Sequence, residues 1–220
     1  MEINRVSLDE LLVESAHILG VSLKDVQRSL LLDYLLLLVK WNSVYNLTSI
    51  KNIRQMLIFH ILDSLSIIPY LSKIRPTQVL DIGSGAGIPG VVLAIVLEDW
   101  KITLNDSVHK KSAFQTHIKA KLNITNLSIV TGRVETLMPG HEVPEKFGAI
   151  VSRALTSLSN LLKFSRHLMA PGCSIWAMKG AYPDKEISNL PTGSYIKQFI
   201  YLTVPMIDAD RCLIEFTVDN

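Results

Sequence analysis

The sequence has 220 residues, of which 48% are hydrophobic and 19% are charged, with a formal net charge of +2. This composition excludes wholesale disorder, and the length is that of one large domain or of a domain with a small addition. Two cysteines make no disulfide framework and no four-ligand zinc site. Neither the half before Pro76 nor the half after it carries a large charge excess, so the charge balance indicates no nucleic-acid tail.

The longest leucine-rich run, residues 30–39, contains Asp33 and is too short to span a membrane. The first ten residues lack the pattern of a secretory signal. We therefore expect a cytoplasmic protein that binds no membrane and no metal ion, and we expect it to be a monomer.

Residues 1–73 are predicted to form helices. Ser7 and Glu10 have the spacing of a capping box, and apolar residues follow at helical intervals until Gly20. A second helix is expected to start near Asp25 and to include the run 30–39. A third helical pattern covers residues 53–68 and stops near Pro69, and the polar and aromatic segment 41–49 is predicted to form a bend.

From residue 77 onward, short apolar strands alternate with helical stretches. Strands are predicted at 79–82, 102–105, 127–130, 149–151, 174–177, 196–204 and 212–218, and helices at 89–97, 108–122, 134–138 and 157–169. This alternation predicts a mostly parallel sheet covered on both faces, and the last two strands, which no helix separates, predict an antiparallel hairpin. The expected fold is α/β, with a helical region at residues 1–73 packed on a domain at residues 74–220.

A glycine-rich turn follows the first predicted strand. Gly83, Gly85 and Gly87 alternate with other residues, and Pro89 suits the first position of the next helix. Glycines let the backbone turn tightly and approach a ligand closely, although a tight turn without a ligand is the alternative interpretation. The dinucleotide fingerprint would need glycine at position 88, where this chain has Ile88.

Two acidic residues flank this turn. Asp81 at the end of the first strand would repel a pyrophosphate but can bind an ammonium group. Asp106 at the end of the second strand can accept hydrogen bonds from both hydroxyls of a ribose, or it can cap the following helix, and both roles can hold together. An amine and a ribose without a phosphate indicate S-adenosylmethionine as the ligand.

With these motifs, the sequence resembles the ribosomal RNA small subunit methyltransferase G family, also called glucose-inhibited division protein B. The resemblance runs in order along nearly the whole chain, through Trp41-Asn42, Tyr45-Asn46-Leu47-Thr48-Ser49, His60-Ile61-Leu62-Asp63-Ser64, the stretch 81–90, Asp106-Ser107, Arg133-Val134-Glu135, Ser152-Arg153-Ala154 and Lys179-Gly180. The glycine turn alone indicates only a methyltransferase, and the other motifs narrow the family. One departure is Asn105, where an apolar residue is usual.

The resemblance implies a class I S-adenosylmethionine-dependent methyltransferase with a Rossmann-like sheet. It implies methylation of N7 of one guanine in the decoding-region loop of 16S rRNA, presented as naked RNA or in a 30S subunit or its precursor. In that family the cofactor contacts match Gly83, Ile88, Val134, Glu135 and Arg153 of this chain.

The chemistry that the residues permit is compatible with guanine N7 as the target. N7 has an exposed lone pair and no proton to lose, so its methylation needs no general base. Methylation of a pyrimidine carbon needs a cysteine nucleophile, and neither Cys173 nor Cys212 follows the first or the fourth predicted strand. Enzymes that methylate exocyclic amines commonly have an Asp/Asn-Pro-Pro-aromatic turn after the fourth strand, where this chain has Ser152-Arg153-Ala154.

Five cationic residues are candidates for contacts with the cofactor or the RNA. Arg153, after the fourth strand, is the predicted catalytic residue, which would orient the cofactor carboxylate or the guanine O6, unless it is a surface arginine. Arg133 is a candidate for an RNA phosphate or the target base, and Lys179 for the RNA backbone. Lys110 and Lys111 can contact RNA phosphates or simply form a solvated helix face.

The sequence leaves more than one interpretation open for His60, for the segment 41–49 and for the function. His60, with Asp63 and Ser64 within reach on its helix, is either a packed, hydrogen-bonded histidine that ties the helices to the sheet or a catalytic group. The segment 41–49 can stack on a base or form a structural bend. The alternative functions are a methyltransferase for a small molecule or a protein, and a non-catalytic nucleotide-binding protein associated with the ribosome.

Overall fold

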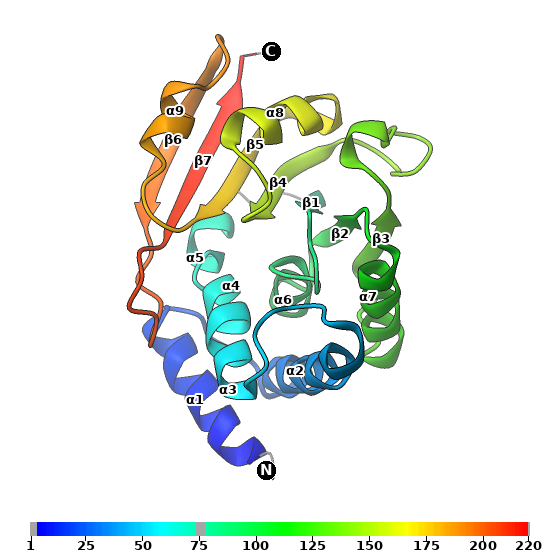
Figure 1. The fold of residues 1–220 in the computed structure, drawn as a ribbon, viewed down its shortest axis with the longest axis vertical. Helices are drawn as coiled ribbons and strands as arrows, with labels where there is room; N and C mark the ends of the chain where they lie inside the picture. The colour runs from blue at the N-terminus through cyan, green and yellow to red at the C-terminus, as the bar shows by residue number, and fades with distance from the viewer. Residues whose placement is uncertain (1–3, 74–77, 220) are drawn as a thin grey trace.

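A seven-stranded sheet forms the centre of the protein, with helices on both of its faces (Figure 1). The computed structural model describes residues 4–73 and 78–219. The strand order is β3-β2-β1-β4-β5-β7-β6. Neighbours among the first five strands pair in parallel, and β7 runs antiparallel to both β5 and β6. The strands are β1 (Gln78–Ile82), β2 (Lys101–Asp106), β3 (Leu127–Thr131), β4 (Phe147–Arg153), β5 (Met169–Lys179), β6 (Ser194–Tyr201) and β7 (Cys212–Val218).

All seven predicted strands and the terminal antiparallel hairpin are confirmed. The last but one strand was predicted to run to residue 204, but β6 ends at Tyr201. The reason is that Leu202 and Val204 are buried in the core beyond the strand, so the apolar pattern continues after the pairing with β7 has stopped.

Helices occupy the first part of the chain and most of the connections between strands. They are α1 (Arg5–Ile18), α2 (Asp25–Tyr45), α3 (Ile53–Met56), the π-helical η1 (Leu57–Leu62), α4 (Asp63–Leu65), α5 (Ile68–Leu71), α6 (Gly90–Val96), α7 (His109–Lys121), the 3₁₀ turn η2 (Val134–Thr136), α8 (Leu158–Ser165), the 3₁₀ turn η3 (Arg166–Leu168) and α9 (Asp184–Ser188).

Several helix ends differ from the predictions. The predicted capping box at Ser7 is wrong, because α1 begins at Arg5 and the Asn4 side chain accepts a hydrogen bond from the Ser7 backbone N–H. Pro89 precedes α6 rather than opening it. The short α9 was not predicted, since none of its residues is buried and it therefore shows no apolar periodicity.

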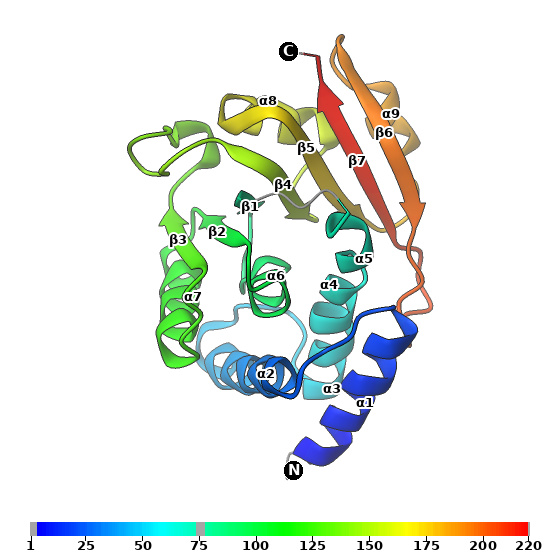
Figure 2. The same cartoon turned by 180° about the vertical axis from the view of Figure 1, so that it is seen from behind.

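Alternate residues of β1 pack in two different cores on the two faces of the sheet. Val79 belongs to the larger core, which includes α2 and α6, whereas Leu80 and Ile82 belong to the smaller core with α8. Figures 1 and 2 show α8 on one side of the sheet and α6 with α2 on the other. Because side chains alternate along a strand, Asp81 points to the same face as Val79, toward α6.

The helical region shares the larger core with the sheet. Leu12 of α1, Leu35 of α2 and Ile61 of η1 are fully buried in the same cluster as Trp176 of β5. The boundary predicted between the helical region (1–73) and the sheet domain (74–220) falls next to residues 74–77, which lie outside the described residues.

The side chain of Tyr34 joins α2 to the glycine-rich turn. Tyr34 is fully buried, and its hydroxyl donates a hydrogen bond to the Ala86 carbonyl over 2.8 Å. Burial raises the pKa of Tyr34 above its ordinary value, so the hydroxyl keeps its proton and remains a donor. Through this bond, the helical region holds the backbone of the glycine-rich turn in place.

We expect Tyr34→Phe to lower the free energy of unfolding by about 1–3 kcal/mol, because the change leaves a buried carbonyl without a partner. Urea unfolding measures this loss. Tyr45→Phe is the control. The Tyr45 side chain is exposed, so loss of its hydroxyl group should change the free energy of unfolding by no more than about 0.5 kcal/mol. Equal losses in the two variants would contradict a specific role for the bond to Ala86.

Candidate active site

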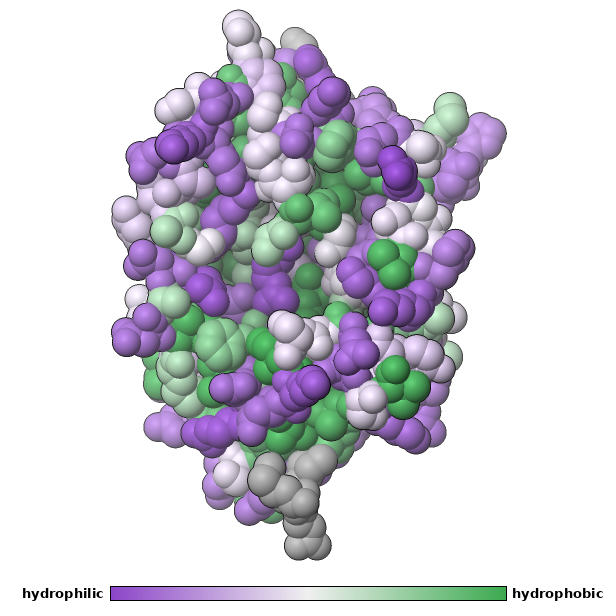
Figure 3. All heavy atoms as spheres, viewed as in Figure 1, coloured by the Kyte–Doolittle hydropathy of each residue, from purple (hydrophilic) through white to green (hydrophobic). Residues whose placement is uncertain are grey.

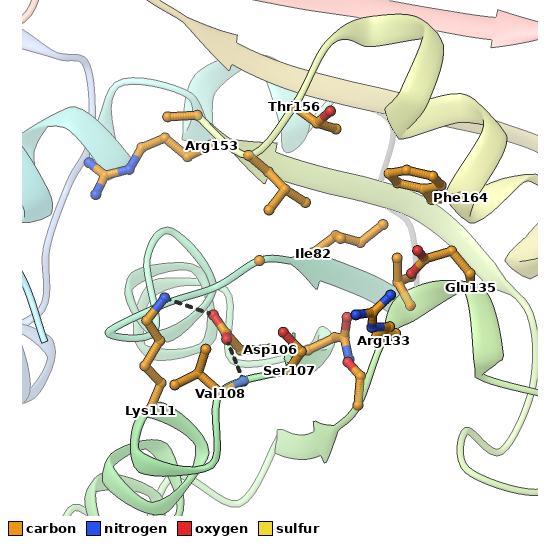
Figure 4. Close-up of a pocket in the computed structure, with 16 residues that line it drawn as sticks. Ile82, Asp106, Ser107, Val108, Lys111, Arg133, Glu135, Arg153, Thr156 and Phe164 are labelled. Atoms are coloured by element: carbon orange, nitrogen blue, oxygen red, sulfur yellow. Dashed lines mark hydrogen bonds and ion pairs between the residues drawn. The ribbon is translucent and has the colours of Figure 1, made fainter.

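The carboxyl ends of β1, β2, β3 and β4 enclose a cavity of about 570 Å³, which we call the first cavity (Figure 4). The face of the molecule seen in Figure 3 is hollowed near its centre, and both hydrophilic and hydrophobic residues border the hollow. Because the carboxyl ends of parallel strands meet at one edge, residues from distant parts of the sequence come together there. The cavity is lined by Ile82, Gly83, Asn105, Asp106, Ser107, Val108, Lys111, Gly132, Arg133, Val134, Glu135, Arg153, Ala154, Leu155, Thr156 and Phe164.

The glycine-rich turn contributes one glycine to the first cavity and supports it with the others. Gly83 lines the cavity, and a Cβ at this position would come within 2.7 Å of the Leu155 side chain. Gly85 has a left-handed backbone (φ +59°), and its N–H donates to the Asp106 carboxylate over 2.9 Å. Gly87, which belongs to the turn, and the buried Ile88 that follows it do not line the cavity.

Asp81 lies beneath the turn and does not line the first cavity. Its side chain is fully buried, and Oδ2 accepts a hydrogen bond from the Gly90 backbone N–H over 2.8 Å, whereas Oδ1 has no hydrogen-bond partner among the described residues. A Cβ at Gly90 would come within 2.7 Å of the same carboxylate, so only glycine fits there. A direct contact between Asp81 and a cofactor stays a prediction.

Burial raises the pKa of Asp81 to about 7, even though the bond from Gly90 and the charge of Arg153 favour the ionised form. The carboxyl group therefore changes its protonation state near neutral pH. The sequence alone could not indicate this, because the face to which Asp81 points depends on the packing of α6.

Asp106 of the first cavity is held by three hydrogen bonds. Its Oδ2 accepts hydrogen bonds from Gly85 N–H and from Lys111 Nζ over 3.4 Å, and its Oδ1 accepts one from the Val108 N–H over 2.9 Å. The helix α7 begins three residues later with Val108 as its cap residue, so Asp106 braces the approach to α7 without being its N-cap. The ribose role stays a prediction.

The residues after β3 form the opposite wall of the first cavity. Arg133, Val134 and Glu135 all line the cavity, and the last two belong to the single turn η2, not to the longer helix predicted for 134–138. The amide of Asn105 donates to the carbonyls of Val130 and Gly132, so this polar residue holds the ends of β2 and β3 together.

Lys110 and Lys111 have separate partners in the structure. Lys111 reaches back to Asp106 inside the first cavity, as Figure 4 shows, whereas Lys110 donates to the Tyr45 carbonyl over 2.9 Å. The two lysines therefore do not form one common face, and contacts of either lysine with RNA stay predictions.

A second cavity, of about 470 Å³, adjoins the first on the side of the helical region. It is lined by Ile50, Phe59, His60, Asp63, Arg153, Ala154, Met178, Lys179, Gly180 and Arg211. Its lining has three side chains that carry a positive charge and one carboxylate. Lys179, a predicted RNA contact, lies here, and its ammonium group donates to the Thr156 carbonyl and to Glu186.

Arg153 lies between the two cavities and is held by the helical region. Its guanidinium donates to the Phe59 carbonyl over 2.7 Å and to Asp63 Oδ2 over 3.0 Å, and a third contact joins it to His60 Nδ1 at 3.3 Å. Figure 4 shows its side chain extending away from the first cavity, toward these helices. Arg153 is thus an anchored residue in the wall between the cavities and not a free surface arginine.

His60 is a neutral, packed histidine. Burial, together with the positive charge of Arg153, lowers the pKa of His60 to about 4. Because a guanidinium can only donate, Nδ1 accepts from Arg153, and the proton on Nε2 points to Thr48 Oγ1 at 3.1 Å. The prediction of a hydrogen-bonded histidine that ties the helices to the sheet is confirmed: its ring contacts Thr48 and Arg153, while the Ser64 hydroxyl donates to the His60 backbone carbonyl.

The prediction of a bend over residues 41–49 is wrong for residues 41–45, which form the last turn of α2, and the chain bends only after Tyr45, where Asn46 has a left-handed backbone (φ 48°). The Asn42 side chain donates to the Ile50 carbonyl and accepts from the Thr48 N–H, so it closes the bend on itself. The ring of Trp41 lies 5.0 Å from that of Tyr45 and packs against α7. The bend in turn presents Thr48 to His60.

Sequence reasoning assigned no separate role to Asp63 and did not single out Arg211. Asp63 is almost completely buried and accepts from two arginines, Arg153 through Oδ2 and Arg211 through Oδ1 over 3.2 Å. Arg211 lies 148 residues beyond Asp63, so no local pattern could pair them. The only available signal was the presence of an acid within the motif of residues 60–64.

Ala154 marks the place where the two cavities meet. It lines both cavities together with Arg153, and its backbone is left-handed (φ +53°), which is strained for a residue with a Cβ. Strain of this kind persists only where the surroundings over-determine the conformation, and it is common at functional sites.

The fold and this edge of the sheet define the class of the protein. The sheet order is that of class I S-adenosylmethionine-dependent methyltransferases. Solved structures have a similar fold: the glycopeptide N-methyltransferase MtfA aligns with a TM-score of 0.59 and 12% identity over 73% of this chain and 96% of that one. An S-adenosylmethionine-dependent methyltransferase from Aquifex aeolicus aligns with a TM-score of 0.53 and 14% identity over 74% and 93%.

The chain belongs to the rRNA small subunit methyltransferase G family, whose model matches residues 27–214. It is 62% identical to the Ribosomal RNA small subunit methyltransferase G of Burkholderia multivorans over 99% of this chain and 96% of the relative. The corresponding protein of Burkholderia vietnamiensis is 60% identical over the same shares. The resemblance inferred from the motifs is confirmed.

Residues 4–73 and 78–219 contain no group of three or more histidine, cysteine or acidic residues arranged to hold a metal ion. Among the same residues, no helix combines the length and the hydropathy needed to cross a membrane.

The raised pKa of Asp81 predicts a pH-dependent stability. An acid whose pKa is higher in the folded than in the unfolded state binds more protons when folded, so its contribution to stability falls as the pH rises from about 4 to about 7. We expect Asp81→Asn, which mimics the neutral acid, to gain stability relative to the wild type over this range. The gain should be roughly 1.4 kcal/mol per pH unit at its steepest.

Urea unfolding at several pH values measures the difference between the two proteins. The lowered pKa of His60 acts in the opposite direction in both, because a neutral buried histidine adds stability as the pH rises, and it cancels in the difference. A difference that does not change between pH 4 and 7 would show that Asp81 is ionised throughout.

Proposed function

We propose that this protein transfers the methyl group of S-adenosylmethionine to N7 of a guanine in the decoding-region loop of 16S rRNA. Membership of the family supports rRNA as the substrate class. The observation that carries the reaction is the shared wall at Arg153 and Ala154, since ligands in the two cavities would face each other there. The proposal includes action as a monomer in the cytoplasm, where ribosomes are assembled.

The first cavity suits the cofactor. Its size and its several polar groups are typical of a small-molecule site, and the left-handed backbone of Gly83 (φ +69°) favours glycine in that wall. Asp106 would hold the ribose, and Val134 with Glu135 would contact the rest of the nucleoside. The bound cofactor supplies a methyl group on a sulfonium.

Four residues predicted to bind the cofactor do not line the first cavity. They would act on the cofactor indirectly, by holding the glycine-rich turn in its conformation. Asp81 fixes the start of α6, and Gly85, Gly87 and Ile88 shape the loop that presents Gly83 and Asp106. We propose that these residues set the position of the cofactor without a direct side-chain contact.

The second cavity suits the guanine and its phosphates. Arg153, Lys179 and Arg211 outnumber the two carboxylates that contact them, Asp63 and Glu186, and Phe59 adds apolar surface. Charged donors of this kind are the usual contacts for RNA phosphates and for guanine O6. Arg133, Lys110 and Lys111 would contact RNA beyond this cavity.

The residues at the shared wall would align the reactants. Holding the N7 lone pair in line with the methyl group converts a bimolecular step into an effectively unimolecular one, an effect worth about 7–11 kcal/mol when the geometry is good. Arg153 is the catalytic candidate because it touches both cavities and is held in place by His60 and Asp63. No proton has to leave N7.

His60 is not available as a general base in this arrangement. Its Nδ1 lone pair accepts from Arg153, and its Nε2 proton is directed to Thr48. Taking up a proton would break the contact with Arg153 and place two positive charges side by side. This argument favours a target atom that needs no deprotonation, as guanine N7 does.

We expect the purified protein to transfer a labelled methyl group from S-adenosylmethionine to 16S rRNA, as naked RNA or in 30S subunits, with the label in 7-methylguanine. Asp106→Asn should weaken cofactor binding by about tenfold or more, since a charge-assisted hydrogen bond contributes about 1.5–3 kcal/mol. Asp99→Asn is the matched control, because Asp99 is exposed and lies outside both cavities. Calorimetry measures cofactor affinity, and nucleoside analysis locates the label.

Label in a protein, in a small molecule or at another atom of the RNA would overturn the proposed substrate. Cofactor binding without transfer to any of these would favour a non-catalytic protein. An unchanged affinity in folded Asp106→Asn would remove Asp106 from the cofactor site.

The single-turnover rate should show no tenfold rise per pH unit between pH 6 and 9, because no enzyme group must take a proton from N7. Arg153→Ala should lower this rate by at least tenfold at every pH. His60→Gln should lower it without adding or removing a pH-dependent step. Rapid-quench measurements with saturating RNA and cofactor separate chemistry from RNA docking. A wild-type rate that rises tenfold per pH unit and becomes flat in His60→Gln would show that a histidine base is required.

A further inference from the structure

An exposed aromatic cluster lies at the outer edge of the sheet and has no part in the proposed transfer step. The ring of Phe199 lies 4.7 Å from that of Tyr182 and 4.8 Å from that of Tyr201, in edge-to-face contacts. We call these three residues the aromatic platform. Tyr182 is 43% exposed and Tyr201 is 73% exposed, whereas Phe199 packs on the smaller core and anchors the other two.

The aromatic platform lies close to two residues of the second cavity, although none of its three residues lines that cavity. Tyr201 pairs with Cys212 of β7, and Cys212 pairs with Lys179 of β5, which lines the cavity. Two strand spacings separate Tyr201 from Lys179, a distance of about 10 Å. Tyr182 follows Gly180, another lining residue, by two positions. Figure 1 shows β6 as the last strand at this end of the sheet.

The exposure of these rings is not explained by the fold. Phe199 alone contacts the core, and the Tyr201 side chain gives most of its surface to solvent. Exposed aromatic rings beside a cationic cavity are the chemistry that binds unpaired nucleotides, because the cations bind phosphates while each ring stacks on a base. The cations of the second cavity, Arg153, Lys179 and Arg211, supply the complementary charge.

We propose that the aromatic platform stacks an unpaired base of the rRNA next to the guanine held in the second cavity. This inference rests on the proposed function and adds to it a site for a neighbouring nucleotide. Stacking of this kind changes affinity by about 5- to 150-fold per base. It contributes to RNA binding without contributing to cofactor binding.

The chain offers a matched control on the same strand. Tyr195 is 47% exposed, similar to Tyr182, but it lies at the other end of β6. An irregularity between Ile196 and Gln198 shifts the register, so Tyr195 pairs with Thr217 whereas Tyr201 pairs with Cys212. Thr217 and Cys212 are five positions apart on β7, so Tyr195 and Tyr201 point to opposite faces of the hairpin.

The experiment compares the double variant Tyr182→Leu/Tyr201→Leu with Tyr182→Phe/Tyr201→Phe and with Tyr195→Leu. The probes are a 16S rRNA transcript, a fluorescein-labelled hexaadenylate and the same ribose-phosphate chain without bases. We expect the leucine pair to bind hexaadenylate at least tenfold more weakly than the wild type, with an unchanged slope of affinity against salt, because no phosphate contact is lost. The phenylalanine pair and Tyr195→Leu should bind hexaadenylate with an affinity within twofold of that of the wild type. The base-free chain should bind all four proteins with equal affinity.

Other results would contradict either the stacking site or the proposed function. Calorimetry with S-adenosylmethionine confirms that every variant is folded. If the wild type methylates the transcript and the leucine pair binds and methylates it equally well, the aromatic platform is not a base site and the proposed function stands. A wild type that does not methylate RNA contradicts the proposed function instead. Equal weakening on the base-free chain, or a change of oligomeric state in the leucine pair, would overturn stacking in favour of a backbone contact or a contact between copies of this chain.

Discussion

The contact of Arg153 with Asp63 and His60 is the interaction on which the arrangement of both cavities depends. It joins the end of β4 to the helical segment at residues 53–65, and the same carboxylate of Asp63 holds Arg211 at the start of β7. Both oxygens of Asp63 therefore have partners, and removal of one partner from a buried pair typically costs about 3–5 kcal/mol. Three distant segments of the chain are fixed around one buried acid.

The glycine-rich turn shows a second constraint, imposed by close packing. A buried carboxylate at Asp81 is tolerated because Gly90 brings its backbone N–H against it, and Gly90 has no Cβ to obstruct that approach. The helical region contributes from the other side through Tyr34, which bonds to the turn at Ala86. The turn is thus held from both sides before any ligand binds, which reduces the ordering cost of binding.

The division of the site into two cavities follows from the sheet topology. The first cavity lies where β1 to β4 end, whereas the second needs the helical region, β5 and the loop before β7. Only Arg153 and Ala154 belong to both, and the strained backbone of Ala154 lies at that junction. A site that brings two ligands together requires such a shared wall, so the helical region is part of the site and not only an extension of the fold.

The sequence by itself determined the strands, the terminal hairpin and the first cavity, because alternation of apolar segments sets the sheet and the carboxyl ends of parallel strands must meet. Gly83, Asp106, Val134 and Glu135 could be placed together on that ground. Only the tertiary structure decided the second cavity. The partners of Arg153 and Arg211 lie 90 and 148 residues away in the sequence, and the burial that sets the charge of Asp81 and His60 arises from packing of helices on the sheet. Local periodicity reports which residues are buried and carries no record of which distant side chains meet there.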